Sequence, residues 1–201
     1  MTLPTTPPAR EALALLRASV SEPVANHSVR AFLFADLLAG HWDVRGQYDP
    51  DALFYATVLH DLGLSRRGAE RPDRFEVAGA DIAAEFLQDN GIATETVDDV
   101  WEAIALHTSV GISSRRGLVC RLTAAGTALD FGADSEFVTD EVAARIHAEH
   151  PRLGAGSTLH TEITGQARVN PTKAPPASLA HFFLVAEQAK ADSILLGRWG
   201  D

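Results

Sequence analysis

The sequence predicts an all-α fold, a helical bundle around one core. Apolar residues recur at helical spacing in segment after segment, and no strong alternation of apolar and polar residues indicates a strand. N-capping residues and proline or glycine stops separate these segments. A chain of 201 residues with 46% hydrophobic and 22% charged residues can bury a sizeable core, so we expect residues 1–201 to form a single domain.

Capping and stop residues mark the limits of the expected helices. We expect the proline-rich residues 1–8 to be disordered and residues 154–177 to form an irregular segment that covers the domain. The expected helices are, in order, one carrying Leu13 to Val20, one from Pro23 to a stop at Gly40, one from Asp49-Pro50 to His60-Asp61-Leu62-Gly63, one from Phe75 to Leu87 after a polar loop over 65–74, one capped by Thr96 and reaching His107, one from Leu118 to Asp130, one between Thr139 and Pro151, and one over 178–196.

Charge and composition limit the possible classes of function. Lys+Arg 17 against Asp+Glu 27 leaves a net charge of −10, which argues against a protein built to bind nucleic acid. The N-terminus lacks a signal-peptide pattern and no apolar run approaches the ~18 residues of a membrane span, so we expect a cytoplasmic protein without a membrane role. The lone Cys120 indicates a buried structural thiol. The apolar final helix could serve an interface as well as a core, which leaves a homo-oligomer open.

Chemistry is indicated where polar residues occupy apolar helices. Asp61 and Asp130 each stand in the last turn of an apolar helix, where a carboxylate opposes the helix dipole and would be costly to bury without a cation. His60 precedes Asp61 on an apolar face, and His27 and His107 also lie on apolar helices. One such histidine is usually structural. Two imidazoles with two carboxylates, however, are a normal ligand set for zinc, manganese, iron or nickel.

The order His27, His60-Asp61 and Asp130 resembles the HD superfamily of metal-dependent hydrolases over roughly residues 20 to 170. The resemblance implies an HD-domain helical bundle in which these four residues bind a single divalent metal ion in the core, zinc first among the candidates, with manganese, iron or nickel as alternatives. Five short stretches are similar to the cyanamide-hydratase-like branch: Asn26 to Arg30, Leu59 to Gly63, Phe75-Glu76, Glu102 to His107, and His150 to Gly154.

Two departures from other branches narrow the expected activity. Phe75 stands where binuclear members have a histidine, which favours one metal ion, and Leu64 stands where nucleotide phosphohydrolases often have a glutamate. The resemblance implies a metal-activated water that hydrates a small molecule, with cyanamide or a related nitrile giving urea or an amide. His107 would transfer a proton or orient the substrate, and Glu76 could orient a ligand histidine. Arg30 could pair with a ligand carboxylate or bind an anionic substrate.

Two alternatives belong to other classes. An HD phosphohydrolase of a nucleotide or other phosphate ester would need cations in its pocket, for which Arg30, Arg66, Arg67 and Arg71 are candidates. A non-catalytic HD domain would bind the metal ion and sense a ligand without turnover, because a fold does not guarantee an activity.

Overall fold

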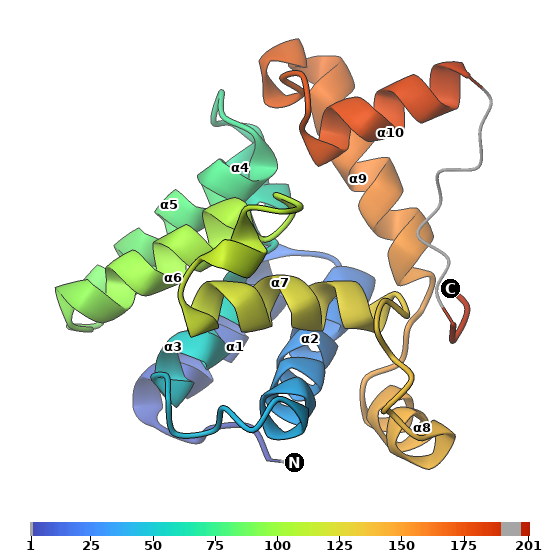
Figure 1. Ribbon diagram of the computed structural model, residues 1–201. Helices are drawn as coiled ribbons and strands as arrows, with labels where there is room; N and C mark the ends of the chain where they lie inside the picture. Colours follow the sequence, from blue (N-terminus) through green and yellow to red (C-terminus); the bar gives the residue numbers. More distant parts are fainter. Residues whose placement is uncertain (1, 190–197) are drawn as a thin grey trace.

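The computed structural model describes residues 2–189 and 198–201. Within these residues the chain is helical and contains no β-strand, as expected from the periodicity (Figure 1). The α-helices are α1 (Pro7–Ser19), α2 (Glu22–His41), α3 (Pro50–Leu59), α4 (Arg66–Ala69), α5 (Phe75–Asp89), α6 (Thr94–Leu106), α7 (Leu118–Asp130), α8 (Asp140–Glu149), α9 (Ala155–Val169) and α10 (Leu179–Gln188), with short 3-10 helices η1 (Leu62–Leu64), η2 (Ser113–Arg115) and η3 (Pro171–Lys173). In the described part of the chain, no helix is long and apolar enough to cross a membrane.

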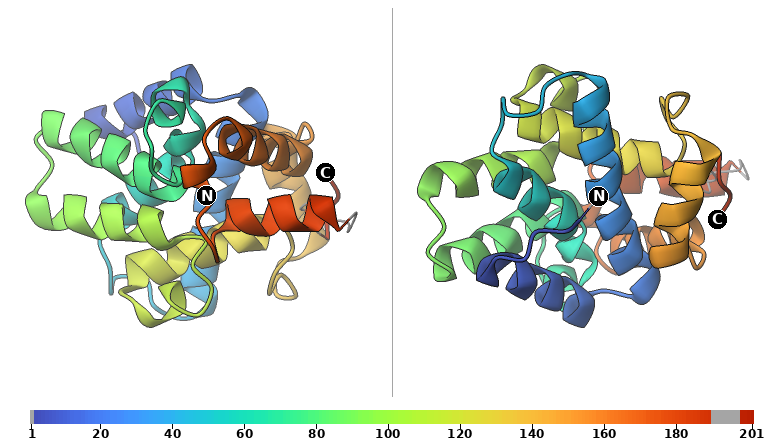
Figure 2. Two further views of the ribbon diagram at one scale, coloured as in Figure 1. Left: turned by 90° about the horizontal axis from the view of Figure 1, so that it is seen from above. Right: turned by 90° about the horizontal axis from the view of Figure 1, so that it is seen from below.

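The central element is α2, which packs against α3 and α7 and also contacts α1, α8 and α9. It carries apolar residues on nearly all sides, and Phe34 and Ala35 in its middle have no exposed surface. A helix that is apolar all round belongs inside a core rather than on a surface. Figures 1 and 2 show α4 to α6 on one side of α2 and α7, and α9 and α10 on the other side.

Glycines allow η1 to lie directly on α5. A Cβ atom on Gly63 would stand 1.8 Å from the carbonyl oxygen of Phe75, and one on Gly79 would stand 2.9 Å from the Gly63 nitrogen. On the other side of η1, a Cβ on Gly68 would stand 2.2 Å from the Gly63 carbonyl oxygen. The backbone that follows His60-Asp61 is therefore fixed against α5 at a distance that only glycine permits.

Residues 154–177 differ from the expected irregular segment. They contain α9, whose buried Leu159, Ile163 and Ala167 recur at every fourth position and pack in a second apolar cluster with α10. Gly154 precedes the helix with a φ of 72°, and the Asp201 side chain accepts hydrogen bonds from the first-turn amides. Packing and capping thus form a helix from a sequence rich in glycine and threonine. The segment does cover the core, but as a helix.

Several expected boundaries also need correction. Disorder over residues 1–8 is wrong for the described residues 2–8, because Leu3 packs on the core and Thr6 caps α1. Gly40 lies within α2 rather than after it, and α6 starts at Thr94 rather than being capped by Thr96. The polar loop over 65–74 contains the short α4. Of the helix expected over 178–196, α10 accounts for Leu179–Gln188, and residues 190–197 lie outside the described residues.

Candidate metal centre

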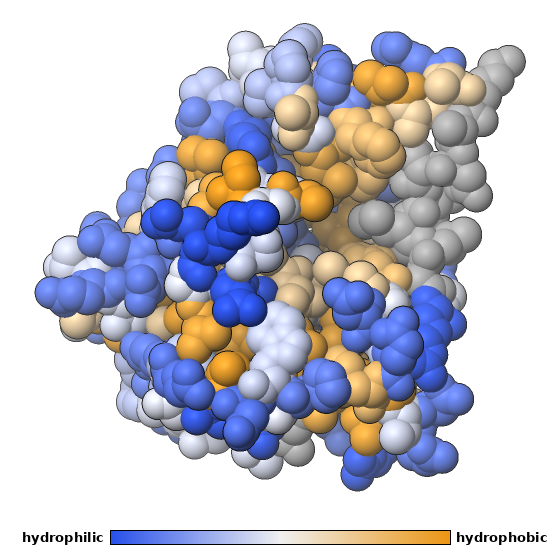
Figure 3. Space-filling view, viewed as in Figure 1, coloured by the Kyte–Doolittle hydropathy of each residue, from blue (hydrophilic) through white to orange (hydrophobic). Residues whose placement is uncertain are grey.

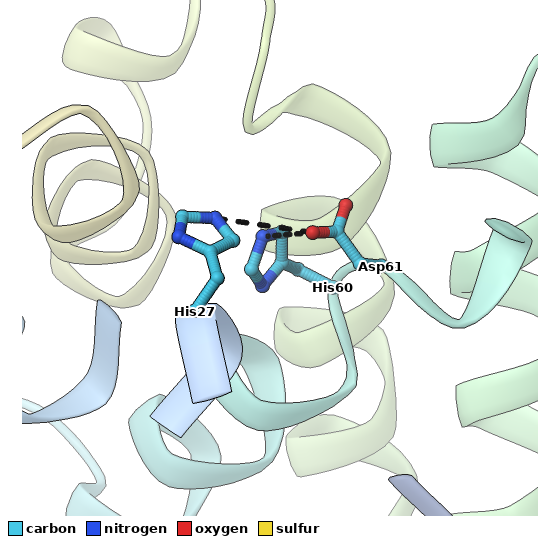
Figure 4. Close-up of side chains that lie close together, drawn as sticks. All are labelled: His27, His60 and Asp61. Atoms are coloured by element: carbon cyan, nitrogen blue, oxygen red, sulfur yellow. Dashed lines mark ion pairs between the residues drawn. The ribbon is translucent and has the colours of Figure 1, made fainter. Parts of the chain in front are cut away.

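Three of the four expected ligands come together where the N-terminal part of α2 lies beside the C-terminal end of α3. His27 projects from the second turn of α2, His60 follows the last residue of α3, and Asp61 joins α3 to η1 (Figure 4). One ligand atom from each lies within 4.8 Å of the other two. The Nε2 atoms of His60 and His27 stand 3.0 Å and 3.8 Å from Asp61 Oδ2, and all three side chains are buried.

Hydrogen bonds determine which ring nitrogens face this cluster. His60 Nδ1 lies 2.7 Å from the carbonyl oxygen of Thr57, which can only accept, so Nδ1 carries the proton. His27 Nδ1 likewise donates to Asp130 Oδ2 at 2.7 Å. In the neutral form that binds a metal ion, His27 and His60 would therefore present the lone pairs of their Nε2 atoms toward the Asp61 carboxylate.

These lone pairs leave buried atoms unsatisfied. Among the described residues, His60 Nε2 and Asp61 Oδ2 have no hydrogen-bond partner although both are shielded from solvent. Acceptors this close repel each other unless a proton or a cation lies between them. Two imidazole nitrogens and one carboxylate oxygen are the donor set of a catalytic zinc site, so the residues fit a divalent metal ion.

Asp130 lies on the far side of His27, not among the three ligands. Its Oδ2 accepts from His27 Nδ1 and, at 2.8 Å, from Arg30 Nη2, and its Oδ1 accepts from Arg30 Nε at 2.8 Å and Arg152 Nη1 at 3.1 Å. The expected four-ligand set is therefore not assembled here, because both oxygens of the fourth member are engaged elsewhere. A carboxylate behind a ligand histidine fixes the ring orientation and makes the imidazole a stronger ligand.

The burial of these groups changes their acidity. Burial by itself raises the pKa of Asp61, but the adjacent His60 outweighs burial and lowers it to about 2. Burial is likewise outweighed at Asp130, where His147, His27 and Arg30 hold the pKa well below its usual range. Burial lowers the pKa of His27, whereas at His60 the Asp61 carboxylate overcomes burial and raises the pKa. Both carboxylates are thus charged at neutral pH, as metal binding requires.

His107 lies beside the cluster and lines the same cavity. Its ring centroid is 4.8 Å from that of His60, and its Nδ1 lies 2.6 Å from the Ile104 carbonyl oxygen, which leaves the lone pair on Nε2. Burial, together with the neighbouring His60, lowers the pKa of His107 to about 4, so the imidazole is neutral at pH 7. A neutral imidazole with a free lone pair can accept a proton.

The cavity at this site has a volume of about 280 Å³ and is mainly apolar away from the cluster. Figure 3 shows a hollow lined by apolar surface between α7 and the pair formed by α9 and α10. Its apolar lining includes Val110, Ala124, Phe131, Leu159, Ile163 and Leu179. No lysine or arginine is among the described residues that line it.

Glu76 and Arg30 do not reach the cavity. Glu76 is buried and binds Arg74 through both oxygens, at 2.9 and 3.0 Å, and accepts from the Thr108 hydroxyl at 2.5 Å. It thus orients Thr108, a residue of the cavity wall, rather than a ligand histidine. Arg30 is fully buried and donates to Asp130 and to the carbonyl oxygens of His150 and Pro151, so it pairs with a carboxylate and is not free to bind an anionic substrate.

The arginines expected in a phosphate pocket are also placed elsewhere. Arg66 pairs with Glu70, Arg67 pairs with Glu85, and Arg71 pairs with both Asp81 and Glu85. With Arg30 committed to Asp130, none of the four candidate arginines lines the cavity.

The structure gives a place at the site to three residues for which the sequence predicted no role, although Arg152 lies in the stretch His150 to Gly154. Arg152 donates to the carbonyl oxygen and to Oδ1 of Asp130, and His147 Nε2 lies 3.9 Å from Asp130 Oδ1. Thr127 lines the cavity, and its buried Oγ1 has no hydrogen-bond partner within the described residues. Thr127 stands one turn before Asp130 on α7, but no local pattern distinguishes a cavity threonine from any other helix threonine.

Comparison with known proteins agrees with this geometry. The HD-domain family model matches residues 24–150, which include His27, His60, Asp61 and Asp130. The chain therefore belongs to the HD-domain family, a class of metal-dependent hydrolases and hydratases. Two cyanamide hydratases of Saccharomyces cerevisiae, DDI2 and DDI3, are each 26% identical to this chain over 157 residues, which cover 73% of the chain and 68% of each relative.

Proposed function

We propose that this protein hydrates the carbon–nitrogen triple bond of a small uncharged molecule, with cyanamide as the first candidate substrate and urea as the product. The observation that carries this proposal is the cavity. It is lined by three candidate metal ligands on one side and by apolar side chains elsewhere, and its described lining residues include no lysine or arginine. A phosphate ester would leave its charge unpaired in such surroundings, which costs several kcal/mol or more. The similarity to two cyanamide hydratases supports the same substrate class.

His27 and His60 would bind the metal ion through Nε2, and Asp61 would bind it through its carboxylate. Zinc suits this donor set best, and manganese, iron or nickel are alternatives. When bound, the ion would supply a water molecule whose pKa is lowered toward about 7. Asp130 would keep the His27 ring in the orientation that directs Nε2 to the ion.

Neutral His107 is the group we assign to proton transfer. As the water oxygen forms its bond to the nitrile carbon, one of the π bonds of the triple bond breaks and the nitrogen takes up protons. His107 Nε2 can accept a proton from the water and return it to that nitrogen, because the Nδ1–H donates to the Ile104 carbonyl oxygen and the lone pair lies on Nε2. The Thr127 hydroxyl, which has no hydrogen-bond partner in the described part of the chain, can bind the substrate nitrogen.

The test is urea formation from cyanamide by protein loaded separately with zinc, manganese and iron(II). Asp61→Ala removes one ligand and is expected to abolish both turnover and stoichiometric metal binding, the latter measured by elemental analysis. Gly165→Ala on α9 is the matched control, because open space surrounds Gly165 and turnover should be unchanged.

Three outcomes would oppose the proposal in different ways. Hydrolysis of nucleotides without hydration of cyanamide would favour a phosphohydrolase. Tight metal binding with no turnover of either class would favour a sensor domain. Two tightly bound ions per chain would contradict the single-metal site.

A further inference from the structure

The cavity is larger than cyanamide requires. Cyanamide has three heavy atoms, and even at the ~30 Å³ that one water molecule occupies in the liquid, three heavy atoms need about 90 Å³. The cavity measures about 280 Å³. About 190 Å³ would thus remain beside a bound cyanamide, enough for about six further heavy atoms.

The chemistry of the wall indicates what fills this space. Leu159 and Ile163 lie one turn apart on the inner face of α9, and Leu179 begins α10. All three line the cavity, and the exposed Val110 in the loop after α6 lines it too. Water in a cavity is held by two to four polar partners, which these side chains do not offer. An apolar substituent suits the wall better than trapped water.

We propose that the substrate class of this site is a substituted cyanamide or nitrile whose apolar group, of up to about six heavy atoms, packs against Leu159, Ile163 and Leu179. This inference rests on the proposed hydratase function and specifies its substrate. For an N-substituted cyanamide, R–NH–C≡N and one water molecule give R–NH–CO–NH₂. The water oxygen bonds to carbon as one C–N π bond breaks, which gives the isourea R–NH–C(OH)=NH. Tautomerisation then moves the hydroxyl proton to the terminal nitrogen and replaces the second C–N π bond with the C=O π bond. The reaction needs no oxidant, reductant or second substrate.

The experiment compares phenylcyanamide with cyanamide on the metal-loaded protein. We expect kcat/KM for phenylcyanamide to exceed that for cyanamide at least about tenfold, because each buried methylene-sized group is worth about fourfold. A second readout does not depend on turnover: the product N-phenylurea should bind at least about tenfold more tightly than urea in calorimetry.

Variants then locate the preference in the wall. Leu159→Trp fills the apolar part and should remove the preference for phenylcyanamide, measured as the ratio of its kcat/KM to that of cyanamide. Leu159 belongs to the second apolar cluster, so Val110→Trp is the companion variant: Val110 is 97% exposed and its replacement needs no change in the core. Val169→Trp, at the exposed end of the same helix and outside the cavity lining, is the matched control and should leave both substrates unaffected.

The outcomes separate this inference from the proposed function. Hydration of cyanamide with an equal or lower kcat/KM for phenylcyanamide overturns the substrate class and leaves the hydratase standing. Hydration of neither compound, with tight N-phenylurea binding that Val110→Trp weakens, supports the apolar subsite and overturns the hydratase. Hydration of neither compound without N-phenylurea binding overturns both.

Discussion

At the scale of single residues, Asp130 shows how one buried carboxylate serves a site it does not enter. Its carboxylate oxygens accept hydrogen bonds from three side chains. These are His27, whose other ring nitrogen faces the candidate metal ligands, and the guanidinium groups of Arg30 and Arg152. The two arginines offset the cost of burying the charge, and the charge in turn orients His27. The sequence identified Asp130 correctly as an anomalous carboxylate at a helix end, but its partners come from segments about 100 and 22 residues away.

The first prediction concerns this carboxylate. Asp130→Asn keeps the size of the side chain but removes the charge that both arginines need. We expect zinc affinity, measured by competition with a chelator, to fall about 10- to 100-fold. The free energy of unfolding should fall by about 3 kcal/mol, because removing one partner leaves buried charges unpaired. Asp134→Asn, an exposed carboxylate in the following loop, is the matched control, and an Asp130→Asn protein that behaves like this control would contradict the role assigned here.

The second prediction concerns the pH dependence of the metal-free protein. His107 in the unfolded chain binds a proton near pH 6.5, whereas burial lowers its pKa to about 4 in the folded protein. Between these values the unfolded state binds more protons than the folded state. His107 therefore does not reduce the free energy of unfolding above pH 6.5, and it reduces this free energy progressively as the pH falls toward 4. At about 1.4 kcal/mol per pKa unit, the loss due to His107 approaches 3 kcal/mol.

The other titratable groups near His107 either lower the free energy of unfolding over the same pH range or act in a different pH range. His27, whose pKa is also lowered, adds to the loss, whereas His60, whose pKa is raised, acts above pH 6.5 and Asp61 acts below pH 3.8. Urea titrations of the chelator-treated protein at pH 7 and pH 4.5 measure the change. His107→Leu should show a smaller decline than the wild type, and equal declines would show that His107 does not titrate as expected.

At the scale of elements, the site depends on how closely η1 approaches α5. Asp61 is the residue before η1, so the contact at Gly63 determines where its carboxylate stands. The expected end of the helix at His60-Asp61-Leu62-Gly63 is thus close but too late, because α3 ends at Leu59 and Gly63 lies within η1. The spatial reason for Gly63, a carbonyl oxygen where a Cβ atom would lie, comes from a helix that begins twelve residues later.

The third prediction tests this contact. Gly63→Ala places a methyl group 1.8 Å from the Phe75 carbonyl oxygen, an overlap that only a backbone shift can relieve. We expect the free energy of unfolding to fall by about 3 kcal/mol, with loss of metal binding in the protein that still folds. Gly165→Ala, in the open part of α9, should instead stabilise the protein by up to about 1 kcal/mol in the same denaturation assay. Equal stability of the two variants would contradict the close approach.

At the scale of the whole molecule, the last residues of the chain pack on helices from three separate parts of the sequence. Trp199 stacks on Phe34 of α2 with ring centroids 5.4 Å apart and contacts His147 of α8 at 5.6 Å. Asp201 accepts hydrogen bonds from the first amides of α9. The last residues thus link α2, α8 and α9, and two of these helices, α2 and α8, carry the Asp130 neighbours His27, Arg30 and His147.

The fourth prediction follows from this link. Trp199→Ala should lower the free energy of unfolding by about 1 to 2 kcal/mol, since the ring is half-buried and an aromatic pair adds about 0.5–1.5 kcal/mol to its area term. Metal affinity should change less than in Asp130→Asn, because Trp199 contacts His147 and not a ligand. Urea denaturation and chelator competition on the two variants provide the comparison. An unchanged midpoint for Trp199→Ala would show that the C-terminal residues add no stability.

The sequence by itself determined the helical class, the starts of α3 and α8, and the choice of His27, His60 and Asp61, which the structure brings together. These depend on local periodicity, capping and the cost of a carboxylate at a helix end, all of which act over a few residues. Only the tertiary structure decided that Asp130 accepts a hydrogen bond from His27 and that Arg30 is buried. It also decided that residues 155–169 form a helix and that the cavity wall is mainly apolar. Each of these depends on partners from distant segments, whose contacts outweigh local propensity once the chain has folded.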